Sequence, residues 1–374
     1  MKTHLRISLF LTIICVLPKC LAAQSHDNLG KIVLDLPPQE DNPRNGEGDF
    51  ITLKNGSILY VYTRFLGDKM SDHAPAQLMS RISEDGGETW SMQDRLEVDR
   101  EGDWNVMSVS LLRLNRGDLA LFYMRKNSLD DCLYYMRTSY DEGLNWSNPE
   151  LVIADSHGYF VTNNDRIIKL KSGRILIPVS RHKTKGTPWS HKGEIWCYYS
   201  DNDGRTWQST EKVPTPDSVI TQEPGLVELQ DGRIMMFIRA SGGRQYRSYS
   251  DDEGLSWSMA TSSVLNSPIS PASIKRLPST GDLFMVWNNN GKSGPGYFKA
   301  KRTPLTVAIS KDEDKSWIYL KNIESNPNGM YCYTAIHEVG DHVLLSYVGK
   351  LDHEEGLGAC IRRIKLEDIY TQDE

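Results

Sequence analysis

The chain has 374 residues, of which 39% are hydrophobic and 25% charged, and its formal net charge is -6 at pH 7. A chain of this length and composition is able to bury a core of its own. The negative net charge and the lack of Lys-rich or Arg-rich runs argue against nucleic acid or an anionic membrane surface as a partner. Any bound anion is therefore expected to be held by a few local cations.

The first residues have the order of features that a secretory signal requires. Lys2 and Arg6 are positively charged, residues 7–17 are apolar, and small residues end at Ala23. The apolar stretch is too short to span a bilayer. We therefore predict a cleaved signal peptide over residues 1–23.

The mature chain is then residues 24–374, which we predict to be one secreted or periplasmic domain with no membrane span. Cys20 raises the alternative of a lipoprotein, but Pro18 and Lys19 stand where such a site carries small and aliphatic residues. Export without lipidation is the interpretation that the sequence favours.

The mature chain keeps four cysteines, which are widely spaced and contain no C-x-x-C pair: Cys132, Cys197, Cys332 and Cys360. This pattern is typical of neither a zinc site nor a dense disulfide framework. We predict four buried thiols, and no metal or cofactor is implied.

An eight-residue pattern, Ser-x-Asp-x-Gly-x-Thr-Trp, recurs along the chain at intervals of roughly 50 to 60 residues, the length of one four-stranded propeller blade. Its Asp and Gly are suited to a tight turn, and its Trp to covering the hairpin that the turn closes. The pattern is therefore a structural motif. Its copies, with Asn202 replacing the Asp in the third and the Gly lost in the last, begin at Ser83, Ser139, Ser200, Ser250 and Ser310.

A second repeated unit, a turn containing Gly followed by an apolar strand, confirms the period. Short strands at regular spacing, without helical periodicity, indicate an all-β chain. The sequence predicts a six-bladed β-propeller of four-stranded antiparallel blades. The apolar runs are 58–62, 119–124, 175–179, 234–238, 283–287 and 343–347.

The first motif resembles the Asp-boxes of the sialidase superfamily, and the resemblance covers essentially the whole mature chain. The box also occurs in propellers that only bind, so the fold alone does not decide the function. Sialidases remove a terminal sugar whose anomeric carbon carries a carboxylate, which would repel a carboxylate nucleophile. They use a neutral Tyr nucleophile instead.

Three segments resemble those that hold sialidase site residues. In 223–239 the resemblance makes Glu223 the base and Arg239 a cationic clamp for the substrate carboxylate. Arg302 matches a second clamp residue just before a late Asp-box. Tyr333 matches the nucleophile better than Tyr331 does.

The N-terminal part supplies the remaining counterparts. Asp72, shortly before the first Asp-box, resembles the general acid/base, Arg44 the first clamp residue and Arg64 an extra pocket arginine. The resemblance implies a retaining exo-α-sialidase-like glycoside hydrolase acting on terminal acidic sugars of glycans. Glu223 would deprotonate Tyr333 as it attacks, and Asp72 would protonate the leaving oxygen.

Four successive apolar strands end in arginine: Arg64, Arg125, Arg181 and Arg239. If the blades superpose, the four guanidinium groups would lie at one depth around the axis and would need an anion or acids between them. The alternative, that they turn outward and pair with Asp-box acids, stays open.

The chain departs from the family around Arg44, where sialidases usually show Arg-Ile-Pro. Here Asn45-Gly46-Glu47 follows, and the acid that normally braces this arginine after the last apolar strand is missing. Glu47 is a candidate replacement for that brace. This departure leaves a related ulosonic or uronic sugar open as the substrate.

Polar residues at 163–166 and along 181–191, where His182, Trp189 and His191 occur, have no family counterpart, and both a pocket-lining and a loop role stay open. A noncatalytic, lectin-like propeller is the rival hypothesis. A purely structural repeat protein is the third.

Overall fold

The computed structural model describes residues 24–25, 29–291, 301–351 and 355–371, so the predicted signal peptide over residues 1–23 lies outside the described residues. The described chain is all-β, as predicted, and its one helix is α1 (Leu366–Tyr370). Within these ranges no helix has the length and apolar character needed to cross a membrane.

Two sheets are four-stranded antiparallel meanders formed in chain order. The second strand of each is buried almost throughout because sheets pack on both of its faces, which explains its continuous apolar sequence. The first sheet is β3 (Asn45–Thr52), β4 (Ile58–Phe65), β5 (Ala76–Ser83) and β6 (Arg95–Val98). The second is β16 (Thr221–Glu228), β17 (Ile234–Ala240), β18 (Arg244–Ser250) and β19 (Thr261–Asn266).

A third four-stranded sheet joins the two ends of the chain. An N-terminal strand that the repeats did not predict forms its outer edge, antiparallel to the last strand, from Lys31↔Arg363 to Leu36↔Ala359. The sheet consists of β24 (Gly329–Val339), β25 (His342–Leu351), β26 (Gly358–Lys365) and β2 (Lys31–Leu36).

The other two sheets are larger. A nine-stranded sheet contains two meanders joined by a single parallel pair, Tyr159↔Cys132. It consists of β7 (Asn105–Arg113), β8 (Leu119–Ser128), β9 (Asp131–Ser139), β10 (Glu150–Leu151), β11 (Gly158–Val161), β12 (Ile168–Lys169), β13 (Ile175–Thr184), β14 (Glu194–Ser200) and β15 (Gln208–Ser209). A five-stranded sheet consists of β20 (Ser273–Arg276), β21 (Leu283–Asn288), β22 (Leu305–Ser310), β23 (Ile318–Glu324) and β1 (Gln24–Ser25).

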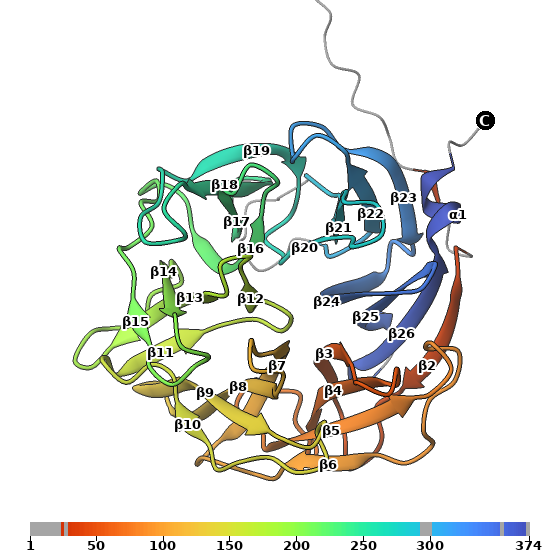
Figure 1. The fold of residues 1–374 in the computed structure, drawn as a ribbon, viewed down its shortest axis with the longest axis horizontal. Helices are drawn as coiled ribbons and strands as arrows, with labels where there is room; N and C mark the ends of the chain where they lie inside the picture. Colours follow the sequence, from red (N-terminus) through yellow and green to blue (C-terminus); the bar gives the residue numbers. More distant parts are fainter. Residues whose placement is uncertain (1–23, 26–28, 292–300, 352–354, 372–374) are drawn as a thin grey trace, which may run out of the picture.

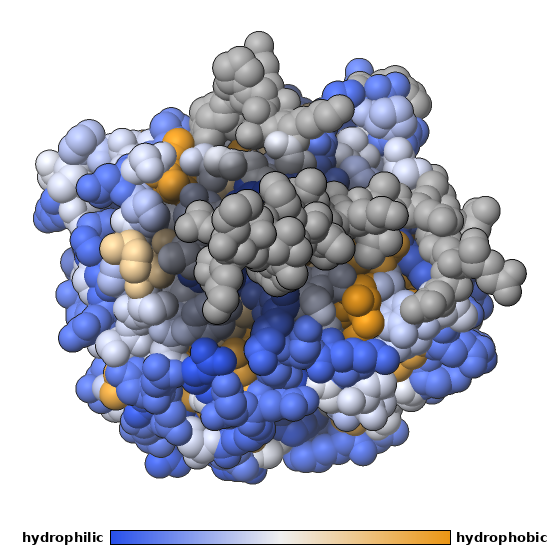
Figure 2. All heavy atoms as spheres, turned by 90° about the horizontal axis from the view of Figure 1, so that it is seen from above, coloured by the Kyte–Doolittle hydropathy of each residue, from blue (hydrophilic) through white to orange (hydrophobic). Residues whose placement is uncertain are grey.

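The sheets stand in chain order around a common centre (Figure 1). β3, β7, β16, β20 and β24 lie nearest that centre, and β6, β10, β15, β19 and β23 lie at the rim. Hydrogen bonding divides the strands into five sheets, so the count of six blades stays a prediction. Figure 2 shows mostly hydrophilic residues on one edge of the ring, with apolar ones in small separate spots.

The Asp-box copies form the turns that their sequence predicts. In the first copy the Asp85 carboxylate accepts from the backbone N–H groups of Glu88 and Thr89 at 3.0 and 2.9 Å, and the N–H of Gly87 donates to Ser83 Oγ at 2.9 Å. The last copy keeps this geometry although Asp314 replaces the Gly: its φ is 69° and its N–H donates to the Ser of that copy at 3.0 Å. The motif is structural, as expected.

A buried ionic cluster connects inner strands at the centre of the ring. Lys275 of β20 forms an ion pair with Asp165, lies 4.0 Å from Asp49 of β3, and donates to the carbonyl of Ile336 in β24 at 2.9 Å. Burial raises the pKa of Asp49, and the nearby Asp165 raises it further. Burial opposes the charged form of Lys275, yet Asp165 and Asp49 raise its pKa overall. The lysine thus compensates two buried acids.

We expect Lys275→Met to lower the free energy of unfolding by roughly 1–3 kcal/mol, because two buried acids lose one of their cationic partners, while water screens the 37% exposed lysine and Arg166 remains nearby. Urea denaturation at pH 7 measures the change. Lys171→Met, at an exposed position of the same sign, is the control and should change stability by less than about 0.5 kcal/mol. Equal effects of the two substitutions would contradict the central role of Lys275.

Candidate functional site

Four inner strands carry a β-bulge, at which one residue adopts a left-handed backbone conformation. Register shifts interrupt β3, β7, β16 and β24 at these points. A bulge breaks the alternation of side chains and can redirect one of them toward a site. The four residues all line the same cavity, and their φ angles are 53° at Glu47, 62° at Ser108, 32° at Glu223 and 57° at Tyr333.

The cavity has a volume of about 370 Å³ and contains five of the seven predicted site residues: Asp72, Glu223, Arg239, Arg302 and Tyr333. Its other polar lining comes from Glu47, Ser108, Lys126, Asn163, His182, His191 and Gln222. Its apolar lining comes from Met107, Met124, Tyr159, Val161 and Trp189. Across the described ranges, no three His, Cys, Asp or Glu side chains gather in a way that would hold a metal ion.

One side of the cavity combines two partly buried guanidinium groups with an acid and a phenol. Arg239 of β17 forms an ion pair of 2.6 Å with Glu223, which lies beside the bulge of the adjoining strand. The guanidinium of Arg302 lies 5.5 Å from the centre of the Tyr333 ring and donates to Cys332 Sγ at 3.1 Å. Burial and the charge of Glu223 raise the pKa of Tyr333, while both arginines oppose this. The phenol is therefore neutral near pH 7.

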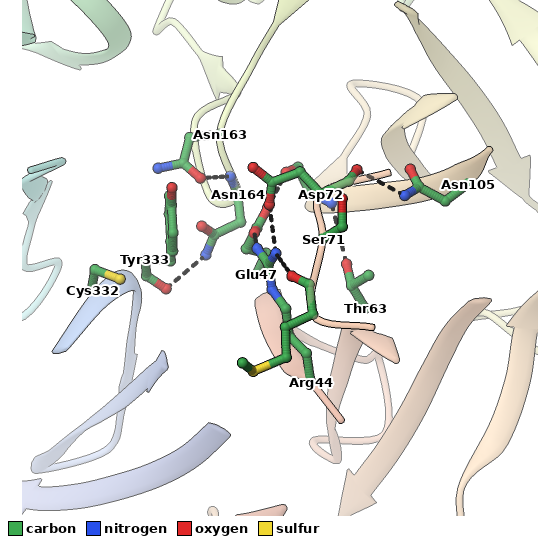
Figure 3. Close-up of polar contacts among 12 residues, drawn as sticks. Arg44, Glu47, Thr63, Ser71, Asp72, Asn105, Asn163, Asn164, Cys332 and Tyr333 are labelled. Carbon is green, nitrogen blue, oxygen red and sulfur yellow. Dashed lines mark hydrogen bonds and ion pairs between the residues drawn. The ribbon is translucent and has the colours of Figure 1, made fainter. Parts of the chain in front are cut away.

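On another side, Arg44 is almost fully buried between two acids (Figure 3). Its Nη2 lies 2.6 Å from Glu47 Oε1 and its Nη1 lies 2.5 Å from Asp72 Oδ1. Nη1 also donates to the carbonyl of Met70 at 3.3 Å, and Phe65 packs on the guanidinium at 4.4 Å. The structure therefore confirms the contact of Glu47 with Arg44, and it places Arg44 behind the carboxylates rather than in the cavity wall.

Asp72 is ionised near pH 7. Burial would raise its pKa, but the charges of Arg44 and Lys126 and the hydrogen bond from Arg44 lower it to about 2. Its loop is anchored by Lys126 Nζ and Asn105 Nδ2, which donate to the Asp72 carbonyl at 3.1 and 3.0 Å. The side chain itself remains 64% exposed, so a bound ligand is able to change its surroundings.

Comparison with known proteins identifies the family. The family model of the BNR repeat-like domain matches residues 97–349. The chain belongs to the BNR repeat-like family.

Solved structures similar to this BNR repeat-like protein share its fold at low identity. A protein of unknown function from Dyadobacter fermentans is 19% identical with a TM-score of 0.71, and the match covers 90% of this chain and 99% of that one. The NanB sialidase of Streptococcus pneumoniae is 14% identical with a TM-score of 0.72, covering 91% and 71%. The intramolecular trans-sialidase of Ruminococcus gnavus is 14% identical with a TM-score of 0.69, covering 94% and 100%. The resemblance to the sialidase superfamily is confirmed for the fold.

The expected ring of strand-end arginines does not form in this BNR repeat-like protein, and Arg64 does not line the cavity. Arg64 pairs with Asp94 at 3.4 Å, Arg125 lies 3.9 Å from the centre of the Tyr135 ring, and Arg181 pairs with Glu194 at 2.6 Å. Each finds its partner within its own sheet, and none of the partners is an Asp-box acid. Of the four, Arg239 alone lines the cavity, where it pairs with Glu223 at the bulge of the neighbouring strand.

Sequence reasoning missed Lys126 and Ser108. Lys126 follows the arginine at the end of β8, so strand alternation turns it to the opposite face, where it is 3% exposed and lines the cavity. The bulge of β7 places Ser108 in the cavity wall, and no sequence motif predicts a bulge at this position. The polar residues without a family counterpart fall into two groups. The cavity is lined by Asn163, His182, Trp189 and His191, whereas residues 164–166 make contacts between sheets.

The four cysteines Cys132, Cys197, Cys332 and Cys360 are free thiols in the described structure, and the first three are buried. This confirms the expectation of single thiols rather than disulfides. Burial raises the pKa of Cys332, while Arg302 opposes the rise. Cys332 therefore supports Arg302 as a neutral acceptor.

The Arg44–Asp72 ion pair should make a pH-dependent contribution to stability. Because the pKa of Asp72 is lowered in the folded state, the contribution is complete above its ordinary pKa of about 4 and is lost as the pH falls toward 2. Water screens this exposed carboxylate, so we expect about 1 kcal/mol or less. Urea unfolding of wild type and Asp72→Asn at pH 6 and pH 3 should show the difference shrinking at pH 3.

The matched control is Asp68→Asn, at an exposed position four residues earlier. This substitution should leave the free energy of unfolding unchanged relative to wild type at both pH values. A difference for Asp72→Asn that grows as the pH falls would contradict the assignment of the ion pair.

Proposed function

We propose that the protein is an exo-acting glycoside hydrolase that releases a terminal carboxylated sugar, sialic acid or a related acidic sugar, from glycans. The observation that carries the proposal is the presence of Arg239, Arg302, Glu223 and Tyr333 on one cavity wall. The sialidase-like fold and the names of the similar solved structures support it.

The charges on this wall favour an anionic ligand. Arg239 and Arg302 are both partly buried and close enough for Arg302 to lower the pKa of Arg239, while one carboxylate, Glu223, offsets them. Burying like charges is unfavourable unless counter-charges are nearby. A ligand carboxylate between the two guanidinium groups supplies the missing negative charge and forms charge-assisted hydrogen bonds.

Tyr333 acts as the nucleophile in two balanced steps. In the first, the phenol oxygen bonds to the anomeric carbon while Glu223 accepts its proton; the glycosidic C–O bond breaks and Asp72 gives a proton to the leaving oxygen. In the second, Asp72 accepts a proton from a water that attacks the anomeric carbon, the bond to Tyr333 breaks, and Glu223 returns the phenol proton. Two displacements retain the anomeric configuration.

The acid step requires Asp72 to hold a proton, whereas Arg44 and Lys126 favour its carboxylate form. A bound substrate covers the exposed side chain of Asp72 and brings a negative charge into the cavity. Both effects disfavour the carboxylate and raise its pKa. Substrate binding therefore favours the protonated form of Asp72 that the acid step requires.

The finer architecture belongs to the same proposal. Dividing the nine-stranded sheet at its single Tyr159↔Cys132 pair gives six units of the propeller type, with β2 completing the last one. In this interpretation residues 24–374 form one propeller that is exported after removal of residues 1–23, and the protein has no nucleic acid partner.

A noncatalytic glycan-binding protein is the second candidate, and the ion pair between Arg44 and Asp72 is the observation that favours it. A carboxylate held ionised by a guanidinium is a poor general acid. If substrate binding does not release it, the cavity binds an acidic sugar without cleaving it.

The test compares release of 4-methylumbelliferone from the α-N-acetylneuraminide, the β-D-glucuronide and the uncharged β-D-galactoside. We expect turnover of an acidic glycoside and none of the galactoside, and a fall in kcat of roughly 10³-fold or more in Tyr333→Phe because the nucleophile is lost. Tyr331→Phe is the control: this neighbour lies outside the cavity lining, and the variant should retain activity within about threefold of wild type.

One result would contradict the proposed mechanism, and another would contradict the hydrolase itself. Turnover that survives Tyr333→Phe would remove the nucleophile from the mechanism. No turnover of either acidic glycoside, together with binding of either free acid in calorimetry, would favour the glycan-binding alternative.

A further inference from the structure

Glu47 presents a buried acceptor to the cavity. It is 3% exposed, and the bulge of β3 directs it into the cavity wall. Its Oε1 accepts from Arg44 Nη2 at 2.6 Å and its Oε2 accepts from Ser108 Oγ. An ionised carboxylate has about four acceptor positions, so these contacts leave room for a donor from a ligand.

Because Arg44 lies behind Glu47, the Glu47 carboxylate rather than the guanidinium borders the cavity. Both Nη atoms of the guanidinium are engaged by carboxylates, Glu47 on one side and Asp72 on the other (Figure 3). Arg44 itself does not belong to the cavity lining, whereas both acids do. A ligand therefore meets carboxylate oxygens where the family resemblance implies a third clamp arginine.

Asn163 supplies an independent observation. It is 2% exposed and lines the same cavity, and its Nδ2 has no hydrogen-bond partner among the described residues. Its Oδ1 accepts from the N–H of Asn164 at 2.9 Å, which fixes the orientation of the amide and leaves the donor end free. A buried donor without a partner is unfavourable by about 1–3 kcal/mol, and a ligand acceptor removes that cost.

The charges of the cavity fall into two groups. The first group consists of two cations, Arg44 and Lys126, and two acids, Glu47 and Asp72. Burial raises the pKa of Glu47, and the charges of Arg44 and Lys126 oppose that rise, whereas the same two cations lower the pKa of Asp72. The group around Arg239 has one positive charge in excess. An anion is thus attracted to the second group, while the first offers neutral hydrogen-bonding partners.

We propose that Glu47 determines specificity by accepting a hydrogen bond from a free ring hydroxyl of the acidic sugar whose carboxylate lies against Arg239 and Arg302. Asn163 Nδ2 donates to a second ligand oxygen. This inference rests on the proposed function for the identity of the cavity as the sugar site. A sugar that lacks this hydroxyl, or carries a methyl, acyl or sulfate group on it, binds more weakly, because the acceptor position of Glu47 that Arg44 and Ser108 leave open is then shielded from water without a donor, or is crowded.

The experiment measures binding by isothermal titration calorimetry, with the full chain carrying Tyr333→Phe to prevent turnover. The ligands are N-acetylneuraminic acid, D-glucuronic acid and, for each, the analogues that lack one ring hydroxyl. For the acid that binds, we expect one analogue to bind at least tenfold more weakly than its parent. Adding Glu47→Gln should bring parent and analogue within about threefold of each other.

Asp72→Asn in the same background is the matched control. It also removes one carboxylate partner of Arg44, but it leaves the Glu47 acceptor in place, so the tenfold discrimination should persist. A thermal melt of each variant shows whether it is folded. Where Glu47→Gln does not fold, Glu47→Asp in the same background replaces it: the shorter side chain withdraws the carboxylate from the ligand, so the tenfold discrimination should fall, and unchanged discrimination would overturn the role of Glu47.

The outcomes separate this inference from the hydrolase. Discrimination that Glu47→Gln abolishes, in a protein without turnover, supports the role of Glu47 and rejects the hydrolase. Hydrolysis with equal binding of parent and every analogue supports the hydrolase and overturns the role of Glu47. Discrimination that survives Glu47→Gln, or binding of neither acid, also overturns it.

Discussion

An inner strand in a ring of sheets has a strand neighbour on one side only, so side chains from other sheets must satisfy its free edge. This structure meets the constraint with buried polar contacts across the centre. Asp49 accepts from the N–H of Leu111 at 2.8 Å, and Asp165 accepts from the N–H of Ile336 at 2.9 Å, each in a different sheet. Lys275 neutralises both acids. The sheets are therefore held together by satisfied polar groups as well as by apolar packing.

The same contacts fix the cavity. Asn164 donates to the carbonyl of Gly48 at 2.8 Å and to that of Tyr333 at 3.2 Å, which connects the bulge beside Glu47 to the bulge that carries the phenol. Left-handed conformations at non-glycine residues are unfavourable by about 1–3 kcal/mol each and persist only where surrounding contacts enforce them. The central network supplies that enforcement, so the positions of the cavity side chains depend on the stability of the centre.

The sequence allowed the local features to be predicted well. Asp-box turns depend on residues within eight positions of one another. The resemblance of separate segments to those of sialidases pointed to Asp72, Glu223, Arg239, Arg302 and Tyr333, and all five line one cavity. The features that were missed depend on distant pairing or on one-residue shifts. β2 closes the last sheet from the opposite end of the chain. Near the ends of these strands, a shift of one residue along the chain moves a side chain to the opposite face of the sheet. For this reason we expected Arg64 in the cavity and did not expect Lys126 there.

The unusual sequence that follows Arg44 changes the charge that this arginine presents to the cavity, because Glu47 and Asp72 both pair with it. A guanidinium held by two carboxylates contributes little attraction at a distance, since the opposite charges within 3 Å cancel its field. Under the proposed function, attraction of the sugar carboxylate then depends on Arg239 and Arg302, and discrimination among acidic sugars depends on the other polar groups of the cavity. Sites that hydrogen-bond a hydroxyl discriminate more sharply than apolar pockets, because the wrong ligand leaves a buried polar group unpaired. Under the same proposal, the placement of Glu47 between Arg44 and the cavity favours selectivity over strength of attraction.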